Sequence, residues 1–258
     1  MEFVEYKKTL NCPSETEICR SRMPVLRRLI HKILPRHAYR ILRFELALAR
    51  VRMGHARVRS RYRGAHDLLV NIAPGPHGCP GWVNVDIGPW ANVNCIYDCR
   101  LSLPFPDSSV RGIFCEHFVE HLDYHEEIPF FLRECWRTLR PGGTMRIIVP
   151  DAERYLRAYA GNWSEMEQIR GLSSGRTDPY TGVVYRSRME IINHIFRQGS
   201  EHKFAYDFET LRLQLLSAGF HDVQNTTFGV SSAPELVLDQ ANRASESLYV
   251  EAIKNNVE

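Results

Sequence analysis

The sequence predicts an α/β fold built on one open, mostly parallel sheet. Short apolar segments alternate with amphipathic segments at helical spacing through most of the chain, the pattern of strands joined by crossover helices. One apolar segment, residues 68–73, runs into a turn rich in glycine and proline at residues 74–78, and the next apolar segment ends at Asp86. With 258 residues, 44% of them hydrophobic, the chain can form one such domain with a core and an appendage.

The turn at residues 74–78 and Asp86 predict a nucleoside-cofactor site. Small residues at a strand tip let a ligand approach the backbone closely, and a carboxylate at the next tip can accept hydrogen bonds from ribose hydroxyls. Gly75 and Asp86 are closer in sequence than a parallel crossover with a full helix usually requires. We therefore expect the first helix to be truncated or absent. This short spacing and the missing GxGxxG pattern argue against a nicotinamide dehydrogenase.

Residues 1–64 form a predicted N-terminal extension with a strong basic charge. Residues 20–63 contain 14 Arg and Lys against one acid, Glu45, which gives +13; the chain total of +3 leaves −10 for the rest. Apolar residues at helical spacing predict amphipathic helices over residues 24–34 and from residue 36 to a stop at Gly54. Residues 57–63 are expected to be a polar linker.

Three interpretations of this basic arm remain open. It can pack on the domain as a cap, and we expect it to cover the sheet face left exposed by the truncated first helix. It can lie on anionic lipid, because apolar area together with basic charge is what an interfacial helix needs. Nucleic-acid contact is disfavoured, since few aromatic residues are available for base stacking: Tyr39, Phe44 and Tyr62.

The body, residues 65–258, is expected to carry the strands and helices of the sheet. Strands are predicted at residues 68–73, 82–87, 93–98, 110–115, 144–149, 220–228 and 248–253, and helices at 126–139, 151–160 and 208–218. Residues 161–187 are polar and glycine-rich and suit a mobile insertion. We assign residues 161–206 to a substrate lid.

Cysteine usage and the absence of targeting segments predict a cytoplasmic protein. The seven cysteines are an odd number, are widely spread and form no CxxC pair, which indicates reduced structural thiols. The N-terminus lacks the pattern of a signal peptide, and no apolar run approaches membrane-spanning length. If the arm binds lipid, the expected location is peripheral, at the inner membrane face.

Three motifs then follow in a fixed order: residues 103–107 (LPFPD), 116–122 (EHFVEHL) and 139–143 (LRPGG). On these residues the segment 67–258 resembles a class I S-adenosylmethionine (SAM)-dependent methyltransferase of the methyltransferase-11-like group. The resemblance implies a Rossmann-like sheet with an antiparallel last strand, SAM as the cofactor, and a turn at residues 141–143 into the fifth strand. The basic arm lies outside it.

The resemblance also implies the cofactor-binding positions. The first loop lies near the methionine moiety, Asp86 holds the ribose hydroxyls, Asp98 lies beside the adenine, and Glu116 follows the fourth strand where cofactor and substrate meet. The predicted cofactor-binding residues are Asn71, Ala73, Pro74, Gly75, Asp86, Ile87, Asp98 and Glu116.

The chain departs from the group at several positions. Ala73 stands where glycine is usual, Pro74 and Pro76 stiffen the loop and each remove a backbone donor, and Arg111 replaces a common aspartate. These changes leave open a non-catalytic module that retains the fold. The intact Asp86 argues against that alternative, as does Asp98.

His117 and Asp151 are the predicted catalytic residues. Methyl transfer needs a general base only when the acceptor is a hydroxyl or a protonated amine, and His117 follows the fourth strand at the expected active edge. A histidine that only packs or caps the next helix is the alternative. Asp151 can orient the substrate or serve as an ordinary helix N-cap.

The substrate-binding prediction falls on His194, His202 and Tyr206, in a segment rich in histidine and aromatic residues. The first two could be metal ligands, but no third ligand has matching spacing, so no metal is predicted.

The leading functional hypothesis is a SAM-dependent methyltransferase that acts on the oxygen or nitrogen of a small molecule or glycan precursor. The alternatives are a methyltransferase guided by the arm to a membrane or nucleic acid, and the non-catalytic module. The sequence does not predict the oligomeric state or the acceptor atom.

Overall fold

The computed structural model describes residues 35–161, 164, 177, 182 and 184–255. The first predicted helix of the basic arm, residues 24–34, lies outside the described residues, as does most of the insertion expected at residues 161–187.

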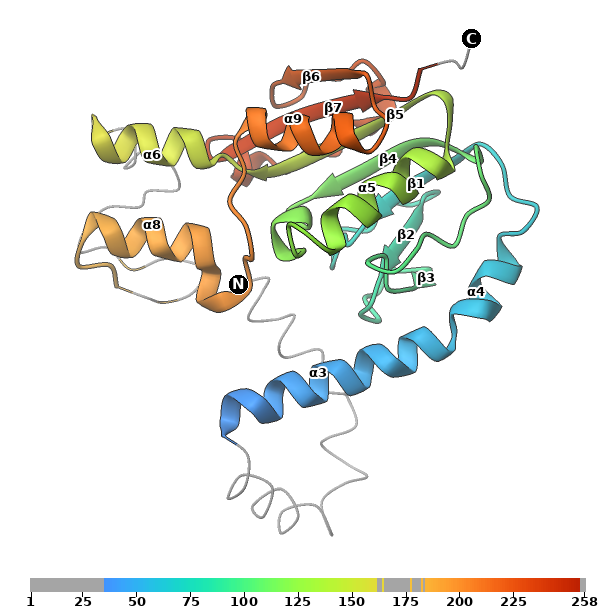
Figure 1. Cartoon of the computed structure of the whole chain (residues 1–258), viewed down its shortest axis with the longest axis horizontal. Helices are drawn as coiled ribbons and strands as arrows, with labels where there is room; N and C mark the ends of the chain where they lie inside the picture. The colour runs from blue at the N-terminus through green and yellow to red at the C-terminus, as the bar shows by residue number, and fades with distance from the viewer. Residues whose placement is uncertain (1–34, 162–163, 165–176, 178–181, 183, 256–258) are drawn as a thin grey trace.

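Across the described residues, seven strands form one sheet in the order β3-β2-β1-β4-β5-β7-β6 (Figure 1). The strands are β1 (Leu68–Ile72), β2 (Val83–Asp86), β3 (Cys95–Ile96), β4 (Val110–Glu116), β5 (Leu139–Pro150), β6 (Asp222–Thr226) and β7 (Ser247–Ile253). β7 is antiparallel to β5 and β6, and the other pairs are parallel. The predicted fold class is therefore confirmed. The strand order reverses between β1 and β4, the point at which open α/β sheets bind ligands.

Three strands differ clearly in length from the prediction. β3 is shorter than the predicted strand at residues 93–98, and β6 (Asp222–Thr226) is shorter than that at residues 220–228. β5 begins at Leu139 rather than at residue 144. The turn expected at residues 141–143 lies inside β5, where Gly142 has a positive φ of 72° and its N–H donates to the carbonyl of Lys254. The ladder between β4 and β5 shifts register at this point.

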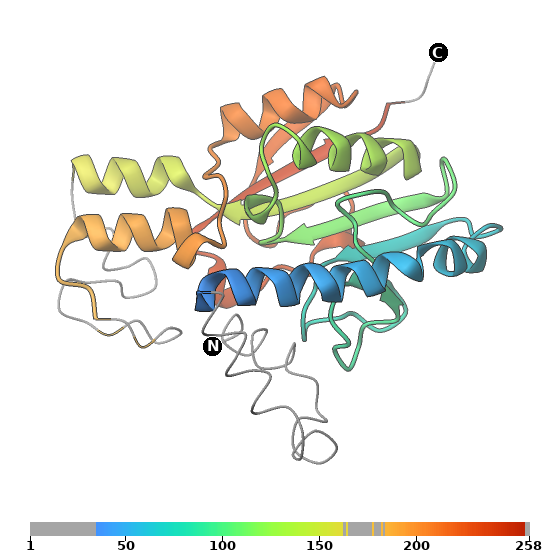
Figure 2. The same cartoon turned by 60° about the horizontal axis from the view of Figure 1, so that its bottom comes forward.

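Helices α5 (Glu127–Thr138) and α9 (Phe208–Ser217) cover one face of the sheet (Figures 1 and 2). The buried residues of α5 recur at positions i, i+3, i+4 and i+7, so the helix presents one apolar stripe to the sheet. α9 begins after Asp207, whose carboxylate accepts a hydrogen bond from the N–H of Thr210. The core between them includes Val70, Ile72, Ile113, Cys115, Ile147, Val149, Ile128, Phe131, Leu132, Leu211 and Leu215.

The connection from β1 to β2 contains no helix, as predicted. Residues 73–82, all of them described, form turns. Asn84 holds this connection, because its side-chain amide both accepts from the N–H and donates to the carbonyl of Cys79, each at 2.9 Å. On the sheet face opposite α5 and α9, Trp82 and Leu236 pack with strand residues Phe114, Ile148 and Tyr249.

A buried ion network lies on the same face. The side chain of Arg146 on β5 is 0% exposed and donates to both carboxylate oxygens of Asp239, at 2.6 and 2.8 Å. It also donates to Glu251 on β7 at 3.0 Å and to the carbonyls of Thr227 and Val230. This Arg146 network fastens the segment before β7 to the sheet.

The described part of the basic arm forms α3 (Arg36–Met53) and α4 (His55–Arg61), which meet at Gly54 (Figure 1). The prediction of a linker at residues 57–63 is therefore wrong for residues 57–61, which belong to α4. His55 stacks on Tyr97 with ring centroids 3.7 Å apart, and Tyr62 meets Phe105 edge-on at 5.1 Å.

These contacts place the arm beside β3 and on the same side as α5, because Tyr62 belongs to the core that α5 covers. The expectation that the arm covers the face left by the truncated helix is wrong. The cluster around Trp82 already occupies that face.

Helices α6 (Ala152–Ala160) and α8 (Arg188–Arg197) pack against each other beyond the sheet (Figures 1 and 2). Their shared cluster contains Tyr155, Ala158, Tyr185, Ile191, Ile192 and Ile195. A capping box between Ser187 and Glu190 starts α8. Of these two helices only α8 belongs to the predicted lid, residues 161–206.

Within the described residues, no helix is both long and apolar enough to cross a bilayer. The described cysteines, at positions 79, 95, 99, 115 and 135, are free thiols, as their spacing predicts. Burial raises the pKa of Cys99, Cys115 and Cys135 well above the usual value, which suits structural rather than reactive thiols.

Candidate functional site

The loop after β1 and the tip of β2 form the first part of the site. Ala73 and Gly75 both have left-handed backbone conformations, with φ of 51° and 54°. The N–H of Gly75 donates to one carboxylate oxygen of Asp86 at 3.1 Å, and the N–H of Gly88 donates to the other at 2.8 Å. Asp86 therefore joins the loop after β1 to the loop after β2.

Asp86 is 4% exposed, and its burial raises the pKa to about 6 against the opposing hydrogen bonds from Gly88, Gly75 and Ile87. A carboxylate can accept about four hydrogen bonds, so capacity remains for a ribose hydroxyl. At Gly75 no heavy atom lies within 4 Å of the position a Cβ would take, so the space beside the loop is open. The acceptor oxygens of Asp86 and this open space are compatible with the ribose and methionine portions of SAM.

The other predicted residues of this part support the loop. Asn71 is buried and donates to the side chain of Asn84 at 3.3 Å, behind the turn. Pro74 and Ile87 are half-buried beside Gly75 and Asp86.

Asp98, predicted beside the adenine, is held by two arginines. The Nε of Arg52 on α3 donates to its Oδ2 at 3.0 Å, and Arg100 donates to both oxygens at 2.9 and 3.0 Å. The Asp98 N–H donates to Nε2 of His55 at 3.2 Å. Burial raises the pKa of Asp98, but the hydrogen bonds and charges of Arg100 and Arg52 together lower it by more. The pKa of Asp98 is therefore below its usual value. The sequence analysis did not predict these partners, and the basic charge of the arm is the only signal for Arg52.

The carboxyl end of β4 supplies Glu116 and His117. The Oε1 of Glu116 accepts from the N–H of Gln240 at 3.2 Å, and burial raises its pKa. His117 has a φ of 52°, rare for a residue with a side chain. Its ring lies between Ser247, with Nε2 to Oγ at 3.0 Å, and Glu120, with Nδ1 to Oε1 at 3.3 Å. His117 is thus oriented by two polar side chains at the expected edge.

Asp151 caps α6, because its carboxylate accepts from the N–H of Arg154 at 3.1 Å. Burial raises its pKa. The backbone beside it is tied to the predicted substrate segment, since the N–H of Ala152 donates to the carbonyl of Tyr206 at 2.9 Å. The capping alternative is confirmed, and a role toward substrate stays a prediction.

The predicted substrate residues separate into two places. His202 and Tyr206 line one small pocket with Glu120 and Phe204, whereas the His194 ring lies against Tyr185, 5.3 Å between centroids. The hydroxyl of Tyr206 is buried without a hydrogen-bond partner among the described residues, and burial raises its pKa.

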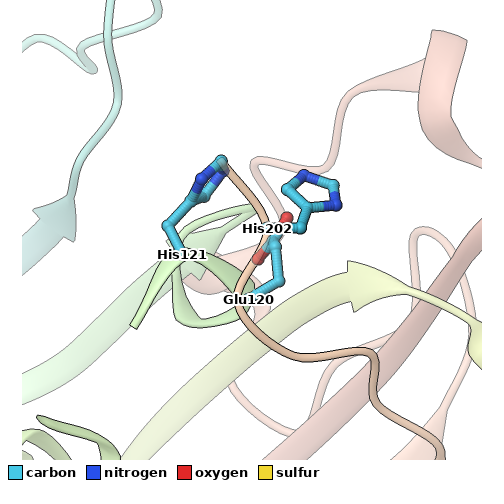
Figure 3. Close-up of side chains that lie close together, drawn as sticks. All are labelled: Glu120, His121 and His202. Carbon is cyan, nitrogen blue, oxygen red and sulfur yellow. The ribbon is translucent and has the colours of Figure 1, made fainter. Parts of the chain in front are cut away.

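Glu120, His121 and His202 lie together at this pocket (Figure 3), with one possible ligand atom from each within 4.8 Å of the others. Burial raises the pKa of Glu120 to about 8 and lowers those of His121 and His202 to about 4 and about 3. The sequence motif at residues 116–122 contains two of these residues. Their meeting with His202 depends on the fold.

Comparisons with known proteins identify one matching family model. Residues 91–147 match the methyltransferase-11 family, described as a methyltransferase domain. No curated protein matches the chain.

Among solved structures, the chain is similar to a SAM-dependent methyltransferase from Archaeoglobus fulgidus, with 20% identity, 79% of this chain and 94% of that chain covered, and a TM-score of 0.43. It is also similar to a SAM-dependent methyltransferase from Thermotoga maritima, with 15% identity, 83% of this chain and 96% of that chain covered, and a TM-score of 0.44. A third match is Haemonchus contortus phosphoethanolamine N-methyltransferase 2 in complex with SAM, with 11% identity, 78% of this chain and 52% of that chain covered, and a TM-score of 0.40.

The matched segment covers the centre of the sheet. It contains β3, β4 and α5 and ends within β5. The sheet is mostly parallel with an antiparallel β7, which is the antiparallel last strand that the resemblance implies. Residues 91–147 thus match a methyltransferase domain, and the proposal of SAM-dependent methyl transfer rests on this match.

Proposed function

We propose that the chain methylates an oxygen or nitrogen atom of a small molecule or glycan precursor, with His117 as the general base. When bound, SAM supplies a methyl group activated on its sulfonium. Such a displacement is promoted mainly by holding the two reactants in line. The observation that carries the proposal is the oriented ring of His117 at the carboxyl end of β4, between Glu120 and Ser247.

The contacts of His117 suit proton transfer at Nε2. Glu120 beside Nδ1 can hold the imidazole in one orientation and, when ionised above its raised pKa of about 8, stabilise the protonated ring. On the other side of the ring, the Ser247 hydroxyl is 3.0 Å from Nε2. An acceptor hydroxyl or ammonium that approaches this point would pass its proton to Nε2, directly or through the Ser247 hydroxyl.

The test compares His117→Gln with His125→Gln, an exposed histidine further along the same loop. The measurement is transfer of labelled methyl from SAM to a panel of hydroxyl and amine acceptors, with SAM affinity determined in parallel. We expect His117→Gln to lower kcat by about 10²–10⁴-fold and to leave SAM affinity and the control unchanged. Unaltered turnover would exclude His117 as the base. SAM binding without transfer to any acceptor would favour the non-catalytic module.

A second candidate is a methyltransferase brought to its substrate at an anionic membrane. Leu42, Leu46 and Met53 on α3 are 45%, 54% and 78% exposed, and their spacing places them on one stripe of the helix. Arg43 and Arg50 follow this stripe along one side. An apolar stripe beside basic residues is the arrangement that lies in a lipid interface.

Cosedimentation with vesicles tests this candidate. Wild-type protein should bind vesicles of phosphatidylglycerol and phosphatidylcholine, and the double substitution Leu46→Gln, Met53→Gln should weaken binding at least about tenfold. Leu213→Gln on α9 is the matched control, since its leucine is 53% exposed. Equal binding by the double variant and the control, or no binding by the wild type, would exclude the membrane role.

A further inference from the structure

The pocket beside the carboxyl end of β4 brings together a carboxylate and two imidazoles from distant parts of the chain (Figure 3). Glu120 and His121 lie in a short 3-10 helix, Val119–His121, and His202 lies in the segment before α9. The backbone holds the two segments together, because the N–H of Lys203 donates to the carbonyl of Glu120 at 2.7 Å. The three side chains are therefore preorganised by the fold.

Both imidazoles are fixed in the same tautomer. Nδ1 of His121 lies 3.1 Å from the carbonyl oxygen of Glu201, and Nδ1 of His202 lies 2.6 Å from that of Ile195. A carbonyl oxygen only accepts, so each Nδ1 carries the proton and each Nε2 presents its lone pair. A backbone carbonyl on one ring nitrogen is the usual support for a histidine that binds a metal through the other.

The carboxylate of Glu120 completes the donor set. Glu120 is 1% exposed, and its Oε1 lies 3.3 Å from Nδ1 of His117 in an ion pair. The guanidinium of Arg243 and the carboxylates of Glu246 and Glu116 also interact electrostatically with Glu120. Burying a carboxylate beside two further carboxylates is costly, and a bound cation would offset this cost.

We propose that Glu120, His121 and His202 form a binding site for a divalent transition-metal ion, with zinc as the best match. Two histidines and one glutamate are a known zinc ligand set that leaves a fourth position open. His194, the other histidine of this segment, is not part of the site, since its ring lies against Tyr185. Bound metal would clip the segment before α9 to the loop after β4. The proposal does not depend on methyl transfer.

The test is calorimetric titration of the chelator-treated full chain with zinc, with circular dichroism to establish that each variant is folded. We expect one zinc per chain. Zinc binding should be at least about 100-fold weaker in His202→Ala and in Glu120→Gln, because losing a ligand should cost more than the 10–100-fold loss typical of changing a residue that only supports a ligand. His194→Ala and His125→Ala are matched controls that keep wild-type affinity.

Cobalt substitution separates this site from binding by the free cysteines. The proposed ligands give visible cobalt bands without the near-ultraviolet thiolate-to-cobalt band. No zinc binding by folded wild type, affinity unchanged in a folded ligand variant, or a thiolate band would each overturn the proposal. Should Glu120→Gln fail to fold, His202→Ala and the cobalt spectrum of the wild type still decide it.

Discussion

Replacing Asp86 with asparagine separates the cost of its buried charge from its role in cofactor binding. The pKa of Asp86 rises from 3.8 to about 6 in the fold, so the ionised carboxylate costs about 3 kcal/mol at pH 8, at 1.36 kcal/mol per pKa unit. Asparagine is neutral and avoids this cost. Its side-chain oxygen can serve only part of the N–H groups of Gly75 and Gly88, a loss of about 1–3 kcal/mol. The two effects oppose each other, and we expect a stability change within about 2 kcal/mol.

The Asp86→Asn substitution should weaken SAM binding. Losing an oxygen that accepts from the ribose should weaken affinity by about 1–3 kcal/mol, or about 5- to 150-fold in Kd. The pH dependence of the wild type provides a second test. Because the folded pKa is raised, the stability contribution of Asp86 is complete below pH 3.8 and is lost as the pH rises through about 6. SAM affinity should change in the opposite sense, falling as the pH drops below about 6.

Calorimetry with SAM at pH 8 and pH 5, together with urea denaturation, measures both quantities. Asp222→Asn, in β6 at the far edge of the sheet, is the control and should bind SAM like the wild type. Unchanged affinity in folded Asp86→Asn at pH 8 would refute the ribose role.

Three further substitutions test the fold by urea denaturation. Arg146→Met breaks the Arg146 network and strands buried carboxylates, so we expect a loss of about 3–5 kcal/mol; a loss below about 1 kcal/mol would contradict it. In Gly112→Ala the new Cβ would meet side-chain carbons at 2.8 and 3.0 Å, which should cost about 1–3 kcal/mol, whereas Gly64→Ala, with open space, should cost less. Tyr62→Ala should cost about 3–5 kcal/mol by emptying a core position; an unchanged midpoint would mean that the arm does not contribute to the core.

The positions of most strands along the chain were predictable because the local pattern of apolar residues and turns marks them. Apolar runs and turns mark β1, β2 and β4, and Asp86 lies at a strand tip in both the prediction and the structure. The length of β3 was not predictable: the prediction gave residues 93–98, but only Cys95 and Ile96 pair with β2. Pairing in so short a strand depends on its neighbour rather than on its own residues.

The partners within the site were less predictable, because they join residues far apart in the chain. Arg52 meets Asp98 across 46 positions, and the sequence shows only that the arm is basic. His202 was recognised as a candidate ligand, but its partners Glu120 and His121 come from another motif. Such contacts follow from tertiary packing, which no local spacing encodes.

The most direct test of the account is calorimetric titration of the purified full chain with SAM and with S-adenosylhomocysteine. We predict micromolar binding of both at a single site, since the two share the ribose that we propose Asp86 holds. A folded protein that shows no binding of either up to millimolar concentration would contradict the assignment of the loop after β1 and Asp86 as the cofactor site.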